Sequence, residues 1–214
     1  MQSSIITVIF SHGKNSSPWY GFKIEKLRPV VLKMGINLIS ISYPENLSIE
    51  EMEDKLYNTV KDNVNVPGDL VFLSSSRGAY ISTRIVQRVI DFYKNEPARN
   101  NGKKDSEILP RRNVLGQFLI APAFYIDPDY YSDQNIQLPE NLKTSIIHGL
   151  DDDVISFENS IKFAKQFKTE LYLIRGNHRL TYNGDKLCVL FESFLKECQA
   201  ESNKIFEKWC IENK

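Results

Sequence analysis

The feature that most constrains the fold is the alternation of short apolar runs with segments of helical spacing. Six runs are rich in β-branched or aliphatic residues, and most of them lack alternating polar positions: residues 5–10, 36–41, 69–73, 114–120, 143–148 and 170–174. Runs that are apolar throughout are typical of parallel strands that are covered on both faces.

The intervening segments have the spacing of amphipathic helices. Residues 50–64 and 80–93 repeat apolar side chains every three or four positions, and residues 156–167 begin at a capping serine, Ser156. A further apolar-striped helix is expected over residues 185–198. Strands that alternate with helices predict the α/β class, here a doubly wound, mostly parallel sheet of about six strands flanked by helices.

Composition limits the function classes that need consideration. A chain of 214 residues fits one domain over 1–214. The formal net charge is zero, so nothing in the charge balance favours nucleic acid or an anionic membrane as a partner. No apolar stretch is long enough to cross a bilayer.

The cysteines are Cys188, Cys198 and Cys210, all in the last part of the chain. Their spacing matches neither a metal site nor a disulfide framework, which suits a reducing compartment. No bound metal is therefore expected. The chain also shows no basic leader or cleavable apolar segment, so a cytoplasmic location is expected.

Three segments do not fit the alternation of strands and helices. Residues 94–112 are polar and are expected to form a solvated loop. Residues 121–141 are rich in aromatic residues and proline, and are expected to wall a pocket or form a small cap. Residues 200–214 are expected to form a C-terminal helical extension that packs on the domain or, alternatively, contributes to a homodimer contact.

The sequence "LSSSRGAY" places three serines where a strand ends and a helix begins. A nucleophile at such a sharp turn needs small residues two positions before and two after it, because the neighbouring backbones crowd together. Ser76 alone meets this condition, between Ser74 and Gly78. The pattern is S-x-S-x-G in place of the usual G-x-S-x-G, and a polar surface turn is the alternative. Ser76 is the candidate nucleophile.

A serine hydroxyl needs a base, and the base needs an orienting carboxylate. In sheets of this kind the chain order is serine, acid, histidine. His12 and His148 come before any acid that this order allows, so His178 is the candidate base. In "HGLDDDVI" the pattern H-G-x-x-D selects Asp152 as the acid, and Asp127 is the alternative.

Four elements in order, "HGK", "SSSRG", "HGLDDDVI" and "GNH", resemble the α/β-hydrolase superfamily, over about residues 5–198. The chain looks closest to small bacterial esterases and thioesterases without a large lid. The resemblance implies a serine nucleophile, no cofactor, and a small ester or thioester as substrate. Many members carry glycine where this chain has Ser74 and Ala79.

The resemblance also implies roles for single residues. Ser76 would attack a carbonyl, His178 would shuttle the proton, and Asp152 would hold the imidazole. The backbone N–H groups of Lys14 and Arg77 would form the oxyanion hole.

Aromatic residues after the fourth apolar run, Phe124, Tyr125, Tyr130 and Tyr131, are expected to line an acyl or aromatic subsite, with core or lid packing as the alternative. The side chain of Arg77 is a further candidate contact for an acidic group of the substrate. Two other functions stay open: a hydrolase-like binding or regulatory protein with an idle triad, and a peptidase.

Overall fold

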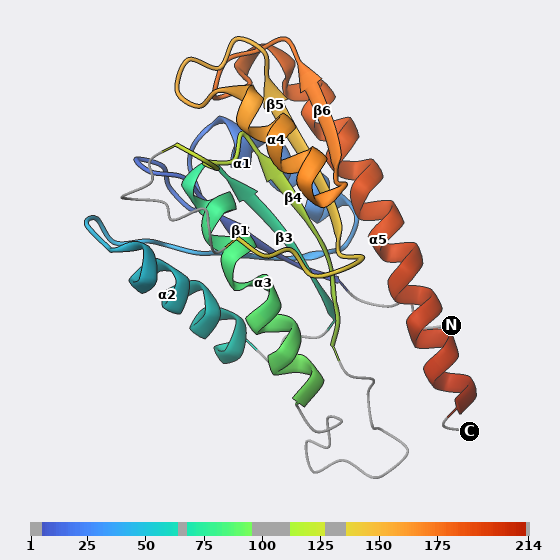
Figure 1. Ribbon diagram of the computed structural model, residues 1–214. Coiled ribbons are helices and arrows are strands. Elements are labelled where there is room, and N and C mark those ends of the chain that lie inside the picture. Colours follow the sequence, from blue (N-terminus) through green and yellow to red (C-terminus); the bar gives the residue numbers. More distant parts are fainter. Residues whose placement is uncertain (1–5, 64–67, 96–111, 127–135, 213–214) are drawn as a thin grey trace.

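The centre of the protein is a six-stranded sheet that is parallel throughout, with the order β2-β1-β3-β4-β5-β6 (Figure 1). The computed structural model describes residues 6–63, 68–95, 112–126 and 136–212. The strands are β1 (Ile6–Ser11), β2 (Asn37–Ser40), β3 (Asp69–Ser75), β4 (Val114–Ile120), β5 (Lys143–Gly149) and β6 (Glu170–Ile174). All six predicted strands and the predicted doubly wound α/β class are confirmed.

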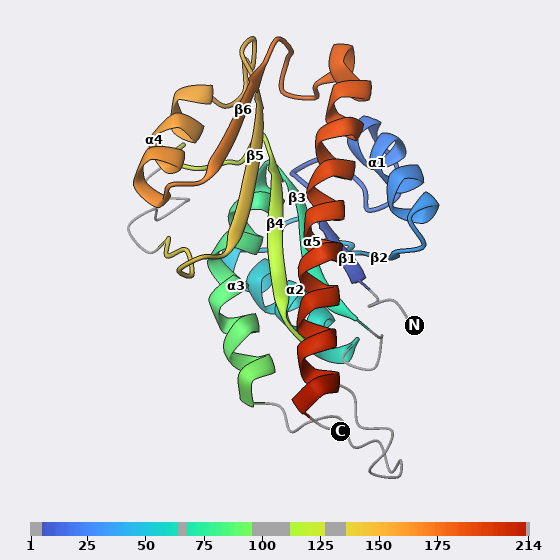
Figure 2. The same cartoon turned by 90° about the vertical axis from the view of Figure 1, so that its right-hand side faces the viewer.

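Helices cover both faces of the sheet (Figure 2). On one face lie α1 (Phe22–Lys33) and α5 (Gly184–Glu212), and on the other lie α2 (Ile49–Asp62), α3 (Arg77–Asn95) and α4 (Phe157–Phe167). A short 3₁₀ turn, η3 (Thr181–Asn183), leads into α5. The helix expected at 185–198 and the expected extension after residue 200 form this one continuous helix, α5.

The two helical layers explain why the strands read as unbroken apolar runs. Along β3, Leu70 and Phe72 pack in the core beneath α2, α3 and α4, whereas Val71 and Leu73 pack in the core beneath α1 and α5. Both sets are buried, so neither face of the strand needs polar side chains.

Helix α1 is an element that the sequence pattern does not predict. It begins after Gly21, which has no side chain to cap the first turn, and it contains Pro29. The helix nevertheless buries Ile24, Leu27 and Val31 against the sheet and packs beside α5. Tertiary packing therefore stabilises a helix whose local signals are weak.

Some of the predicted features lie outside the described residues. These are most of the polar loop expected at 94–112 and residues 127–135 of the expected pocket wall or cap. Among the helices that the structure describes, none has the length and apolar character needed to span a membrane.

The packing of α5 on the sheet yields a stability prediction. Phe191 is fully buried, and the centre of its ring lies 5.1 Å from that of Phe118 on β4. Replacing Phe191 with alanine leaves a cavity there, so we expect the free energy of unfolding to fall by about 3–5 kcal/mol in urea denaturation. The control is Val189→Ala on the same helix, whose side chain is 66% exposed and should change stability by less than about 0.5 kcal/mol. Equal losses in the two variants would contradict the packing described here.

Candidate active site

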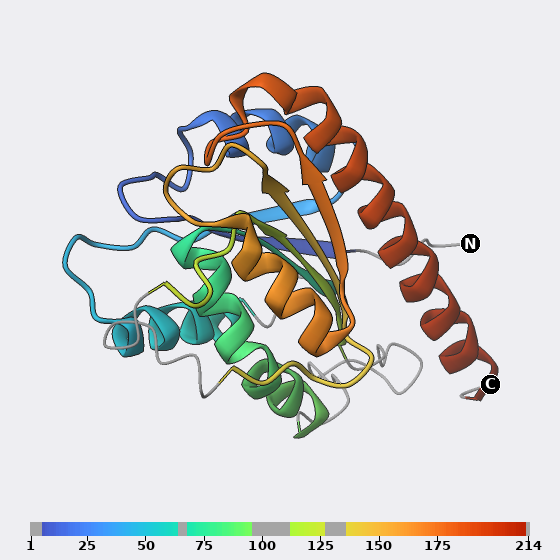
Figure 3. The ribbon, with the colours of Figure 1, turned by 45° about the horizontal axis from the view of Figure 1, so that its top comes forward.

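The three residues predicted to form a triad follow three different strands of the sheet. Ser76 comes directly after β3, Asp152 follows β5, and His178 follows β6. The carboxyl ends of parallel strands meet at one edge of a sheet, where open α/β sheets place their ligands. Figure 3 turns the molecule so that the loops at this edge come forward.

Ser76 occupies a sharp turn between β3 and α3. Its φ of 53° lies in the left-handed region, which a residue with a side chain seldom adopts. The turn is held on both sides: the Ser76 N–H donates to the Ile120 carbonyl at 2.9 Å, and the Ser76 carbonyl accepts from the Ala123 N–H at 3.1 Å. Strain that the surroundings maintain in this way is typical of functional sites.

The positions two before and two after Ser76, occupied by Ser74 and Gly78, differ in how much space they leave for a side chain. A Cβ atom on Gly78 would lie 2.2 Å from the Ser11 carbonyl oxygen and 2.5 Å from that of His12, so only glycine fits there. Ser74 is fully buried opposite Ser11 in the β1–β3 ladder, and its Oγ has no hydrogen-bond partner in the described structure. Serine is thus accommodated at the position where the pattern G-x-S-x-G has glycine.

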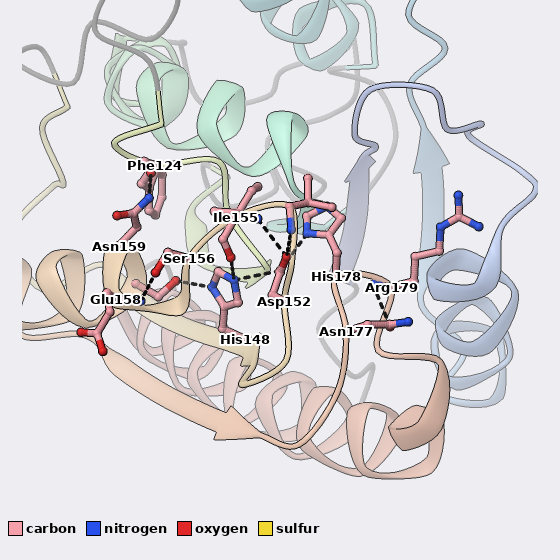
Figure 4. A network of polar contacts seen from close by, with 12 residues as sticks. Phe124, His148, Asp152, Ile155, Ser156, Glu158, Asn159, Asn177, His178 and Arg179 are labelled. Carbon is pink, nitrogen blue, oxygen red and sulfur yellow. Dashed lines mark hydrogen bonds and ion pairs between the residues drawn. The ribbon is translucent and has the colours of Figure 1, made fainter.

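The Asp152 carboxylate is the centre of a hydrogen-bond network (Figure 4). Its Oδ2 accepts from His178 Nδ1 at 2.8 Å and from His148 Nε2 at 3.0 Å. Its Oδ1 accepts from the backbone N–H groups of Val154 and Ile155, each at 2.9 Å. Burial by itself raises the pKa of Asp152, but these four hydrogen bonds outweigh it and hold the pKa far below its ordinary value. The group is therefore ionised at neutral pH.

Two glycines let the acid and the histidine meet. A Cβ atom on Gly149 would lie 2.2 Å from the Gly176 carbonyl oxygen, so the loops that follow β5 and β6 touch through their backbones. Two further backbone bonds join them: Leu150 N–H to the Ile174 carbonyl at 2.8 Å, and Asp151 N–H to the Gly176 carbonyl at 2.9 Å.

Of the three histidines, two are engaged in the core. His148 is fully buried, and both neighbours of its Nε2, Asp152 Oδ2 and the Ile155 carbonyl, are acceptors, so Nε2 carries the hydrogen. Its Nδ1 then accepts from the Ser160 hydroxyl at 2.7 Å. His148 therefore supports the acid from the inner side.

His12 holds the turn after β1. Its Nδ1 lies 2.8 Å from the Gly13 carbonyl oxygen, and its Nε2 faces the Tyr43 N–H at 3.5 Å. Burial lowers the pKa of His12, and the Arg77 guanidinium nearby adds to this shift. The Arg77 side chain thus lies near His12, and it is absent from the lining of the cavity described next.

A cavity of about 920 Å³ opens at this edge, and both Ser76 and His178 line it. Lys14 lines it too, and the Gly13 backbone lies against the serine, since a Cβ atom on Gly13 would be 2.9 Å from Ser76 Cβ. No hydrogen bond joins Ser76 Oγ to His178 within the described residues. Catalytic hydrogen bonds of this kind are often long in the free enzyme and tighten when substrate binds.

The aromatic residues predicted to bind substrate lie elsewhere. Phe124 is fully buried and stacks on Phe163 of α4, with ring centres 4.2 Å apart. The Tyr125 hydroxyl donates to Gln166 at 3.0 Å. Both residues contact α4, and neither is among the residues that line this cavity; packing of this kind is the alternative that the sequence left open. Tyr130, Tyr131 and the alternative acid Asp127 lie outside the described residues.

One residue of the cavity escaped the sequence analysis. Lys23, in the first turn of α1, lines the cavity and donates from Nζ to Ser75 Oγ at 2.8 Å. Burial lowers the pKa of this lysine to about 7, with Asp152 opposing the shift and Arg179 adding to it. A lysine marks a site poorly by itself, and this one belongs to the helix that was not predicted.

Comparison with known proteins agrees with this architecture. The sequence has no match among protein-family models and no significant match among curated proteins. Solved structures do match: an alpha-beta serine hydrolase homologue from Coxiella burnetii has a TM-score of 0.64, with 16% identity over 91% of this chain and 86% of that one. The chain has the α/β-hydrolase fold.

Other proteins with the α/β-hydrolase fold match to a similar extent. Est1E from Butyrivibrio proteoclasticus has a TM-score of 0.70 at 14% identity, covering 92% of this chain and 89% of that one. An esterase from Pyrococcus furiosus has a TM-score of 0.62 at 14% identity, covering 94% and 83%.

The close approach of α3 to β1 yields the second prediction. Gly78→Ala places a methyl group against two backbone carbonyls that cannot both move, so we expect a loss of about 3 kcal/mol in the free energy of unfolding. Gly35→Ala is the matched control: φ is +68° there, but a Cβ atom would meet nothing within 4 Å. Its left-handed backbone should cost about 1 kcal/mol. Urea denaturation measures both values, and a loss at Gly78 no larger than that at Gly35 would contradict the crowding.

Proposed function

We propose that this protein is a serine hydrolase that cleaves carboxylic esters or thioesters through an acyl-enzyme intermediate. The observation that carries the proposal is the arrangement around one cavity. Ser76, in a left-handed turn, lines the cavity together with His178, and His178 is hydrogen-bonded to an ionised Asp152. The proposed activity is that of small esterases and thioesterases without a large lid, which the sequence resembles.

In the proposed reaction Ser76 Oγ attacks the substrate carbonyl carbon and His178 Nε2 takes the hydroxyl proton. Nε2 is available for this because Nδ1 is bound to Asp152. The tetrahedral intermediate carries its negative charge on the former carbonyl oxygen, which the backbone N–H groups of Lys14 and Arg77 would stabilise. Collapse releases the alcohol or thiol with the proton from His178. Water then repeats the sequence and releases the acid, so the reaction needs no cofactor.

Ser75 is the rival nucleophile, because Lys23 Nζ lies 2.8 Å from its Oγ and serine–lysine pairs can also cleave acyl groups. Ser75, however, is the last residue of β3 and is buried, whereas Ser76 is half-buried in the strained turn. The position after the strand favours Ser76.

Labelling with a fluorophosphonate separates these assignments. We expect the wild-type protein to be labelled on one serine and Ser76→Ala to lose the label completely, because the phosphonate bonds only to an activated hydroxyl. Ser74→Ala removes a neighbouring hydroxyl that has no hydrogen-bond partner among the described residues, and should keep the label. Mass spectrometry of the labelled peptide identifies the residue.

The outcomes of this experiment exclude each other. Label on Ser75 would show that Ser75, and not Ser76, is the nucleophile. A folded wild-type protein that takes up no label would favour the alternative of a binding protein with an idle triad. Turnover of peptide amides in preference to esters would favour a peptidase.

The role of Asp152 yields a kinetic prediction. Asp152→Asn removes the carboxylate that orients His178, so we expect kcat for p-nitrophenyl acetate to fall by about 10⁴-fold. Asp151→Asn, which removes the same charge from an exposed neighbouring side chain, is the control and should leave kcat within about twofold. Comparable activity in Asp152→Asn and the wild type would refute the assignment of the acid.

A further inference from the structure

The cavity beside Ser76 is cationic although the chain as a whole has no net charge. Its lining contains three basic side chains, Lys14, Lys23 and Arg179, and one acidic side chain, Asp153. Lys14, Arg179 and Asp153 are exposed at the mouth, whereas Lys23 is half-buried and reaches the serine run itself. The positive charge of the lining is therefore local to the proposed reaction centre.

The folded protein offers few favourable interactions to the ammonium group of Lys23. Its polar partner is the neutral hydroxyl of Ser75, and it forms no ion pair with a carboxylate among the described residues. It belongs to the first turn of α1, where the helix macrodipole opposes a cation. Burial lowers the pKa of Lys23; the charge of Asp152 offsets this shift only in part, and the like charge of Arg179 adds to it.

An anionic ligand would reverse each of these effects. The anion would neutralise the half-buried ammonium group of Lys23. The helix dipole at the start of α1, which opposes the positive charge of the lysine, would also stabilise the negative charge of the ligand. A residue whose placement costs stability, as that of Lys23 does, is expected at a functional site.

We propose that the substrate carries a carboxylate in addition to the bond that is cleaved, and that Lys23 binds this carboxylate and determines specificity. The single ammonium suits one carboxylate oxygen, whereas phosphate groups are usually held by several donors. Lys14 and Arg179 at the mouth would attract the anion. This inference rests on the proposed hydrolase function and narrows its substrate class to acidic esters or thioesters.

A pair of substrates of matched length tests the proposal. p-Nitrophenyl hydrogen adipate carries a free carboxylate at the far end of a six-carbon acyl chain, and p-nitrophenyl hexanoate lacks it. We expect the full-length wild-type protein to have a kcat/KM at least about tenfold higher for the adipate ester at pH 7.

Lys23→Met keeps most of the side-chain volume and removes the charge. It should lower the ratio of kcat/KM for the adipate ester to kcat/KM for the hexanoate ester to about one, mainly through a higher KM for the adipate ester. Lys33→Met is the matched control, because this exposed lysine lies in the last turn of the same helix, away from the cavity. It should keep the wild-type preference.

Two results would overturn the proposal: equal kcat/KM values for the two esters in the wild type, or an equal fall in kcat for both in Lys23→Met. The second result would mean that Lys23 stabilises the oxyanion instead of the substrate carboxylate. The wild-type ratio decides the matter even where a variant fails to fold.

A failure of the hydrolase function gives a different result, because the wild type would then cleave neither ester and would resist the fluorophosphonate. In that case adipate itself serves as the probe. A rise in Tm with adipate in the wild type and in Lys33→Met, but not in Lys23→Met, would support the carboxylate site on its own, and no rise in any of them would refute it.

Discussion

The backbone of α3 approaches the end of β1 so closely that the geometry around Ser76 depends on this contact. Gly78 lies against the carbonyls of Ser11 and His12, without room for a Cβ atom. The chain can only reach this position by leaving β3 through a left-handed residue, which is Ser76. The same contact brings the Gly13 backbone against the serine side chain. The turn that holds the hydroxyl and the loop proposed to stabilise the oxyanion are therefore parts of one packed unit, and neither can shift alone.

The second constraint is the ionised carboxylate of Asp152. Four donors converge on it, and two of the residues that supply them, His178 and Val154, also line the cavity. Three of the donors, His148 and the backbone N–H groups of Val154 and Ile155, bind the carboxylate independently of His178, so its position does not depend on the histidine that is proposed to exchange protons. His148 serves this purpose with the hydrogen on its Nε2, which lies within hydrogen-bond distance of both Asp152 Oδ2 and the Ile155 carbonyl.

Sequence patterns predicted what depends on local spacing. The inner strands β1, β3, β4 and β5 were recognisable because most of their side chains are buried on both faces. The turn at Ser76 was recognisable because crowding demands small residues at fixed offsets. Helix α1 was missed because Gly21 does not cap it and Pro29 interrupts its pattern, so its stability comes from contacts with the sheet and α5. Lys23 was missed with it. The contact of Phe124 was not predicted for a similar reason: its aromatic character suggested a pocket, but its partner Phe163 lies on a helix thirty-nine residues further along the chain, and no local signal reveals that contact.

The backbone contact between Gly149 and Gly176 has a consequence for how such a chain can diverge. A side chain at position 149 would collide with the Gly176 carbonyl, a side chain at position 176 would press against Leu180 in its own loop, and the two loops share backbone hydrogen bonds. If recombination or protein engineering exchanged the loop after β5 without the loop after β6, the backbones of the two loops would no longer fit together. We therefore expect the loops that carry Asp152 and His178 to diverge together, because a change in the backbone of one must be matched by a change in the other.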